Sequence, residues 1–118
     1  MYNYSESINL LLNAFPKLKS IYEENIDDYE GLPYVFYESV FVKYIMDKIH
    51  SHSEAELSSI FDFVENLLLN GDEEIRNLVG VAVIESLYYE KEFMKFNESL
   101  LKFYGELTAK SFEDCFAK

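Results

Sequence analysis

The fold is decided in the stretch from Leu67 to Leu87, which reads LLLNGDEEIRNLVGVAVIESL. Asn70-Gly71 predicts the end of one helix, with the glycine supplying a left-handed cap. The acids that follow favour a helix start, because the first turn of a helix carries a partial positive charge; they are Asp72, Glu73 and Glu74. The apolar run at 78–84 predicts that this next helix is buried and central.

The helix before this turn is expected at Glu54–Asn70. Ser53, with Glu56 three residues on, has the pattern of a capping box. Its apolar residues recur at helical spacing; they are Leu57, Ile60, Phe61, Val64, Leu67 and Leu68. The two helices therefore predict a central αα-hairpin, and Gly80 and Ala82 predict the close approach of a neighbour.

Helical periodicity extends over the rest of the chain. Further helices are expected at Ser5–Phe15, at a short segment opened by Pro16, and at Leu32–His50, Glu92–Phe103 and Glu106–Phe116. The segment Asn25–Gly31 is expected to be a loop. The prediction is an all-α fold: one domain, 1–118, forming a compact bundle of six to seven helices with helical-repeat-like packing.

The composition narrows the classes of partner. The 118 residues carry a net charge of −12, and 49% of them are hydrophobic, which argues against disorder. An acidic surface repels nucleic acid and anionic membranes, because both are bound through Lys and Arg. A basic protein is the natural partner. The alternative is that the charge only keeps the protein soluble.

The sequence favours a cytoplasmic location. Cys115 is the only cysteine, so no internal disulfide is possible. The N-terminal residues lack the basic region of a signal peptide, and no apolar run approaches the length of a membrane span. Cys115 lies on the apolar face of the last helix and is expected to be a buried structural thiol.

No pattern of residues indicates catalysis. Asp47, His50 and Glu54 would share one face only if the helix continued past Ser51, and His52 lies off that face. The histidines are better explained by solvent exposure at a helix C-terminus. No phosphate-binding loop or nucleophile motif occurs. We therefore expect no enzyme activity, no cofactor and no metal.

The acids are segregated along the chain. No Lys or Arg occurs between Lys19 and Lys43, or between Lys48 and Arg76. The first of these windows is also rich in tyrosine, a residue type enriched at protein interfaces. For Tyr29 both a core and an interface position stay open, whereas Tyr22 is expected in the core.

Part of the chain resembles a known family. The resemblance runs from Leu32-Pro33, which leads a long helix, through Leu68–Glu74, and is sharpest in Gly71–Leu87. The family consists of small, acidic, all-helical bacterial proteins of otherwise undefined function. Some members are immunity proteins of contact-dependent growth inhibition and related polymorphic toxin systems. One such system pairs a helical immunity protein with a ribonuclease-A-like toxin domain. The resemblance implies binding and neutralisation of a toxin.

The leading hypothesis is therefore an immunity protein whose acids occlude the active site of a basic toxin domain, plausibly an RNase. The alternative is a helical adaptor or self-association module that binds a peptide or protein without inhibiting a toxin. The candidate partner-binding residues are Glu23, Glu24, Asp27, Asp28, Tyr29, Glu30, Asp72, Glu73 and Glu74.

Overall fold

The computed structural model describes residues 1–117, so position 118 of the expected domain lies outside the described residues. In chain order the elements are η1 (Tyr4–Glu6), α1 (Ser7–Ala14), η2 (Pro16–Leu18), α2 (Lys19–Glu24), α3 (Ile26–Tyr29), α4 (Pro33–Phe36), η3 (Tyr37–Phe41), α5 (Val42–His50), α6 (Glu54–Asn70), α7 (Glu73–Leu78), η4 (Val79–Glu85), α8 (Ser86–Tyr88), α9 (Phe93–Leu100), η5 (Leu101–Phe103) and α10 (Glu106–Phe116). The all-α prediction is confirmed.

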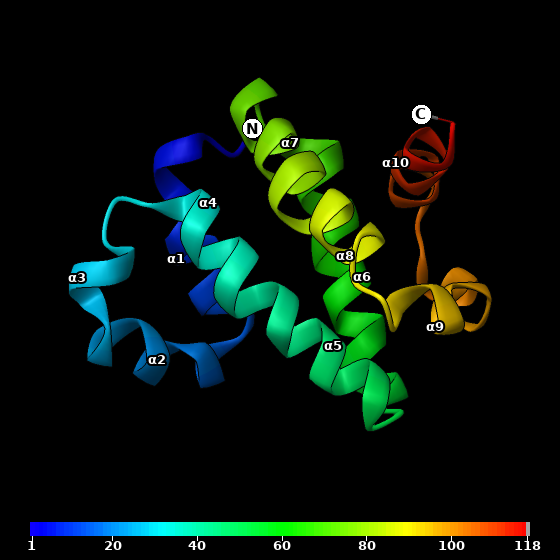
Figure 1. Cartoon of the computed structure of the whole chain (residues 1–118). Helices are drawn as coiled ribbons and strands as arrows, with labels where there is room; N and C mark the ends of the chain where they lie inside the picture. Colours follow the sequence, from blue (N-terminus) through cyan, green and yellow to red (C-terminus); the bar gives the residue numbers. More distant parts are fainter. Residues whose placement is uncertain (118) are drawn as a thin grey trace.

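Three long rods form the centre of the molecule (Figure 1). One rod runs without a break through α4, η3 and α5, and another through α7, η4 and α8. The third, α6, packs against both, as the predicted αα-hairpin and its neighbour require. Elements α1 to α3 lie on one side of these rods, and α9 and α10 lie on the other (Figure 1).

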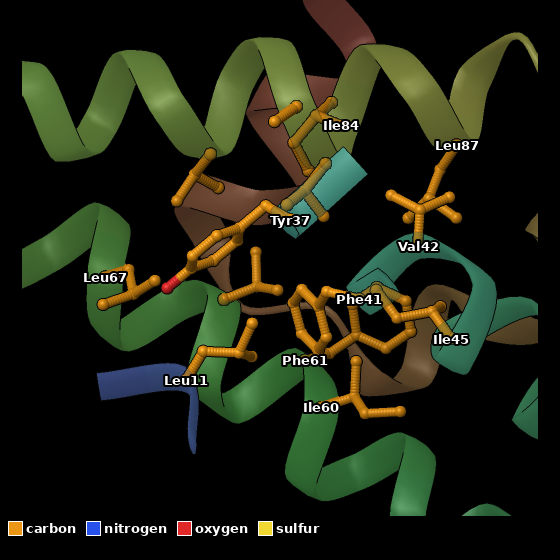
Figure 2. Close-up of a cluster of buried hydrophobic side chains, with 14 of the residues drawn as sticks. Leu11, Tyr37, Phe41, Val42, Ile45, Ile60, Phe61, Leu67, Ile84 and Leu87 are labelled. Atoms are coloured by element: carbon orange, nitrogen blue, oxygen red, sulfur yellow. The ribbon is translucent and has the colours of Figure 1, made fainter. Parts of the chain in front are cut away.

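The core fills the space between the three rods and α1. Figure 2 shows side chains from each of these elements converging there: Leu11, Tyr37, Phe41, Phe61 and Ile84. Tyr37 is fully buried, and its hydroxyl donates a hydrogen bond of 2.7 Å to the backbone carbonyl of Ser7. Burial raises the pKa of Tyr37. Each aromatic side chain buries a large area, so the rings in this core contribute strongly to its stability.

Two of the rods contain a π-helical segment, which the sequence did not predict. The segments are η3 and η4, and they pack against each other. A π turn closes a longer hydrogen-bonded ring than an α turn, so successive residues rotate less around the axis. Three consecutive residues can then face the core, as at Val40–Val42 and at Ala82–Ile84.

The turn between α6 and α7 differs from its prediction. Gly71 has φ −85° and ψ 157°, so it is extended and not left-handed. Its lack of a side chain is needed for another reason: a Cβ there would collide with Cγ2 of Ile75 and the carbonyl of Leu67. Tyr2 also pairs with this turn, donating from its N–H to the Asn70 carbonyl and accepting from the Asp72 N–H, both at 2.8 Å.

Several local predictions were wrong. The segment Asn25–Gly31 contains the short helix α3. Glu56 does not complete a capping box with Ser53, because its carboxylate binds Tyr44 and Lys17. A Cβ added at Gly80 would meet nothing within 4 Å, so no neighbour approaches closely there.

The first helix and several inward faces also differ from the sequence pattern. Ser5 has the residue type of a helix cap, but the first helical turn begins at Tyr4 and its N-cap is Asn3. Helical spacing predicts inward positions for five residues that are in fact exposed: Ile21, Val35, Val81, Leu101 and Phe116. Cys115 is buried, as predicted.

Candidate functional site

The helices α2 and α3 form an acidic corner, defined here as Glu23, Glu24, Asp27, Asp28 and Glu30. All five of these side chains are exposed. The ion pairs found among residues 1–117 involve none of them. The local sequence explains this, because no cation occurs between Lys19 and Lys43. The corner therefore presents a field of one sign to an approaching molecule.

Tyr29 lies within the acidic corner but is half-buried. Its ring meets Phe36 of α4 edge-on, with the ring centroids 5.1 Å apart. Tyr22 of α2 packs on the same phenyl ring at 5.3 Å. Both tyrosines thus fasten the corner to α4. Tyr29 also lines a cavity of about 360 Å³ together with Leu18 and Ile21, so part of its ring remains accessible.

The second group of predicted residues, Asp72, Glu73 and Glu74, lies at the start of α7, and Asp72 has a different role from the two glutamates. Asp72 is the N-cap: its carboxylate accepts from the Ile75 N–H at 2.8 Å and from the Tyr4 N–H at 3.3 Å. It is therefore occupied in holding the N-terminal segment. Glu73 and Glu74 are exposed and line a cavity of about 660 Å³.

The acidic corner and the start of α7 lie on either side of α4. Tyr22 and Tyr29 pack on Phe36, whereas Asn77 of α7 donates a 2.5 Å hydrogen bond to the Tyr34 hydroxyl. Residues two apart in a helix point about 200° away from each other. Figure 1 shows α4 between α3 and α7. The nine predicted residues therefore do not gather into one patch.

A third surface was not predicted. A groove of about 530 Å³ lies along the line where η3 packs against the rod formed by η4 and α8. The side chains that line it include Glu38, Val42, Val81, Glu85, Tyr89 and Glu90. Val81 belongs to the apolar run at 78–84 that predicted burial, but its side chain is exposed on η4. Glu85 and Glu90 lie on the same side of the groove as Val81, and their i and i+5 spacing gave no local signal.

A polar network lies beside another cavity, of about 320 Å³, where the end of α1 meets α5 and α6. The Tyr44 hydroxyl donates to the carboxylate of Glu56, which also pairs with Lys17 at 3.1 Å. Burial, followed by the hydrogen bond to Glu56, raises the pKa of Tyr44 to about 12. The hydrogen bond from Tyr44, followed by that from Lys17, lowers the pKa of Glu56. The network joins the N-terminal helices to the central rods.

The histidines pack on an aromatic ring. His50 and His52 both lie edge-on to Phe96, with ring centroids 5.6 Å and 6.1 Å away. Within the part of the chain that the structure describes, no three His, Cys, Asp or Glu side chains are grouped to hold a metal ion. Nor is any helix among residues 1–117 long and apolar enough to cross a membrane.

The fold and these surfaces define an acidic, all-α protein of a single compact domain with carboxylate-rich surfaces. The chain belongs to a family described as a domain of unknown function, DUF7674, whose model matches residues 8–117. Comparison with curated proteins found no match, and comparison with solved structures found none either.

Proposed function

We propose that this protein is an immunity protein that binds and neutralises a basic bacterial toxin domain, with an RNase as the leading candidate. The observation that supports this best is the acidic corner: five exposed carboxylates on α2, on α3 and on the residue that follows α3, with the partly accessible Tyr29 among them. The resemblance of Gly71–Leu87 to immunity proteins of polymorphic toxin systems gives the class of partner. In this proposal the protein acts in the cytoplasm, without catalysis, cofactor or metal.

The inhibition would be steric and electrostatic. A ribonuclease binds the phosphates of its substrate through Lys, Arg or protonated His. Carboxylates of the acidic corner can take the place of those phosphates and block access to the active site. With a net charge of −12, the protein would also attract a basic toxin at long range, which speeds association at low ionic strength.

The first test is a pull-down from the native bacterium, with elution over rising salt and identification of the released proteins by mass spectrometry. We expect a basic protein that salt releases, and expect its nuclease activity to stop when the purified immunity protein is added. A captured nuclease that stays active at saturating immunity protein would refute the proposal, as would the absence of any salt-sensitive partner.

A variant with three reversed charges tests whether the acidic corner is the surface that binds the toxin. Asp27→Lys, Asp28→Lys and Glu30→Lys together should slow association and weaken binding at least tenfold, because rim charges mainly set the association rate. The matched control is Asp62→Lys, Glu98→Lys and Glu113→Lys, which changes the net charge equally at exposed positions elsewhere. Equal losses in the two variants would show that only net charge matters, and not the corner.

The helical adaptor is the second candidate, favoured by the exposed aromatic side chains near α8. Association through apolar area responds little to salt, whereas inhibition through the acidic corner responds strongly. The salt profile of elution therefore separates the two functions.

A further inference from the structure

We propose that the groove between η3 and the η4–α8 rod is a docking surface for a basic, arginine-bearing helix of a partner protein. This inference does not depend on the partner being a toxin, because it rests on a different surface from the acidic corner. Its basis is the combination of a groove, a set of carboxylates that line it, and an exposed tyrosine at the groove that contacts further aromatic rings.

The groove offers apolar contacts from both of its walls beside the carboxylates. It lies between η3 and the η4–α8 rod, and its volume is about 530 Å³. Val42 is buried at its base, while Val81 on the opposite rod is 43% exposed. An amphipathic helix binds in this way, with apolar side chains directed into the groove between two helices.

A row of contacting aromatic rings begins at the groove with Tyr89. Tyr89 lines the groove and is 73% exposed. Its ring packs edge-on against Tyr88 at 5.1 Å, and Tyr88 packs edge-on against Phe116 at 5.3 Å. Phe116 is itself exposed. Rings held in this way by their neighbours lose little entropy when a partner covers them, and aromatic residues are enriched at interfaces.

The charges of the groove select the occupant. The charged side chains among its lining residues are Glu38, Glu85 and Glu90, which come from both walls. An arginine side chain can use both the carboxylates and the tyrosine of the groove, because a guanidinium pairs with a carboxylate and stacks on an aromatic face. Nucleic acids and anionic lipids are repelled by the same carboxylates. The chemistry therefore fits a helix with arginine and aliphatic side chains on one face.

The probe is a synthetic amphipathic peptide of roughly 16 residues, with arginine and leucine at i, i+3, i+4 and i+7 on one face. Its control is a scrambled peptide of the same composition and charge. Binding is measured by fluorescence anisotropy in physiological salt, where long-range attraction is screened. We expect saturable binding of the amphipathic peptide, at least tenfold tighter than that of the scrambled one. Equal affinities, or no saturable binding, would overturn the proposal.

Variants that neutralise pairs of carboxylates test where the peptide binds. Glu38→Gln with Glu90→Gln should weaken the amphipathic peptide about tenfold, because both carboxylates face the groove. The matched control is Glu23→Gln with Glu24→Gln, which makes the same chemical change in the acidic corner and should stay within about threefold of the wild type. Loss of affinity in the corner variant equal to that in the groove variant would contradict a specific site.

A second pair of variants tests the aromatic contribution. Tyr89→Ala should weaken binding about tenfold, as expected for an aromatic residue that a partner covers at an interface. Leu101→Ala removes another exposed apolar side chain outside the groove and should have little effect. All of the altered side chains are exposed, so folding should be retained.

Mapping by NMR gives a readout without mutation. Backbone amide shifts on titration with the amphipathic peptide should concentrate at Val81, Ser86 and Glu90. Shifts concentrated in α2 and α3 would place the peptide at the acidic corner and overturn the assignment.

Discussion

The carboxylate of Glu65, midway along α6, caps the first turn of α10 by accepting two hydrogen bonds from Thr108. The backbone N–H of Thr108 lies 2.9 Å from Oε1 and its hydroxyl 2.8 Å from the same oxygen, while the Leu107 N–H donates to Oε2 at 3.1 Å. The N-terminal N–H groups of a helix need such acceptors. The cap of α10 is therefore supplied by a residue far away in the chain, and it fixes α10 against α6.

Removal of this cap should destabilise the protein. Glu65→Ala leaves the N–H groups of Leu107 and Thr108 without their acceptor, which we expect to lower the free energy of unfolding by about 2 kcal/mol. Denaturant unfolding followed by circular dichroism measures the change. Asp62→Ala, at an exposed position one turn away on α6, is the control and should change stability by less than about 0.5 kcal/mol. A similar loss in both variants would show that the cap contributes nothing.

The same carboxylate should make stability depend on acid pH. Burial acts to raise the pKa of Glu65, but hydrogen bonds from Thr108 and Leu107 outweigh it, and the net pKa is lowered from 4.5. A carboxyl whose pKa is lower in the folded state stabilises that state above the unfolded pKa and loses this effect as the pH falls through the folded value. The free energy of unfolding should therefore decrease as the pH is lowered below about 4.5, and this decrease should be less steep in Glu65→Gln.

Thr108→Val, which removes only the hydroxyl donor, should give an intermediate slope. An unchanged slope in Glu65→Gln would assign the acid sensitivity to other groups.

Two glycines should respond in opposite directions to the same substitution. Gly71→Ala places a Cβ against Ile75 and the Leu67 carbonyl, and should destabilise by about 1–3 kcal/mol. Gly80→Ala adds a Cβ to open space within a helix, and should stabilise by about 0.5–1 kcal/mol. Thermal and denaturant unfolding of the two variants measure the difference. Loss of stability in Gly80→Ala would mean that the surface of η4 does not tolerate a methyl group.

The buried hydroxyl of Tyr37 provides a further test. Tyr37→Phe removes the donor to the Ser7 carbonyl and should cost about 1 kcal/mol, since a buried acceptor loses its partner. Tyr89→Phe, at an exposed ring, is the matched control and should be neutral. An equal effect at both positions would contradict a role for the buried hydrogen bond.

The fold could be predicted from the sequence where apolar residues recur at helical spacing. The stripe of α6 and the buried run that follows Asp72 are long, so their positions were predicted well. The helix α3 was missed because it is a single turn without a stripe; the contact of Tyr29 with Phe36 holds it. The π segments were missed because a change of one residue per turn hardly alters a short hydrophobic pattern.

The candidate site could be predicted only in part. The exposure of Asp27 and Asp28 follows from their charge, as expected. The cap that Asp72 provides for α7 can be predicted, because an acid often precedes a helix. Its contact with the Tyr4 N–H could not be predicted, because Tyr4 is far away in the sequence. The groove was missed because Val81 lies in an apolar run, and the packing of η4 against η3 decides which side chains of that run are exposed.

The pairing of Tyr2 with the turn at Gly71 has a consequence for biosynthesis. The Tyr2 backbone bonds to Asn70 and Asp72, and the Tyr4 N–H also bonds to Asp72. During translation these partners are synthesised almost seventy residues after Tyr2. The segment from Tyr2 to Tyr4 therefore cannot form its native hydrogen bonds until α6 and the turn after it have been synthesised. Closure of such a long loop is entropically costly. We therefore expect the N-terminal segment to be among the last parts to acquire protection from hydrogen exchange during folding.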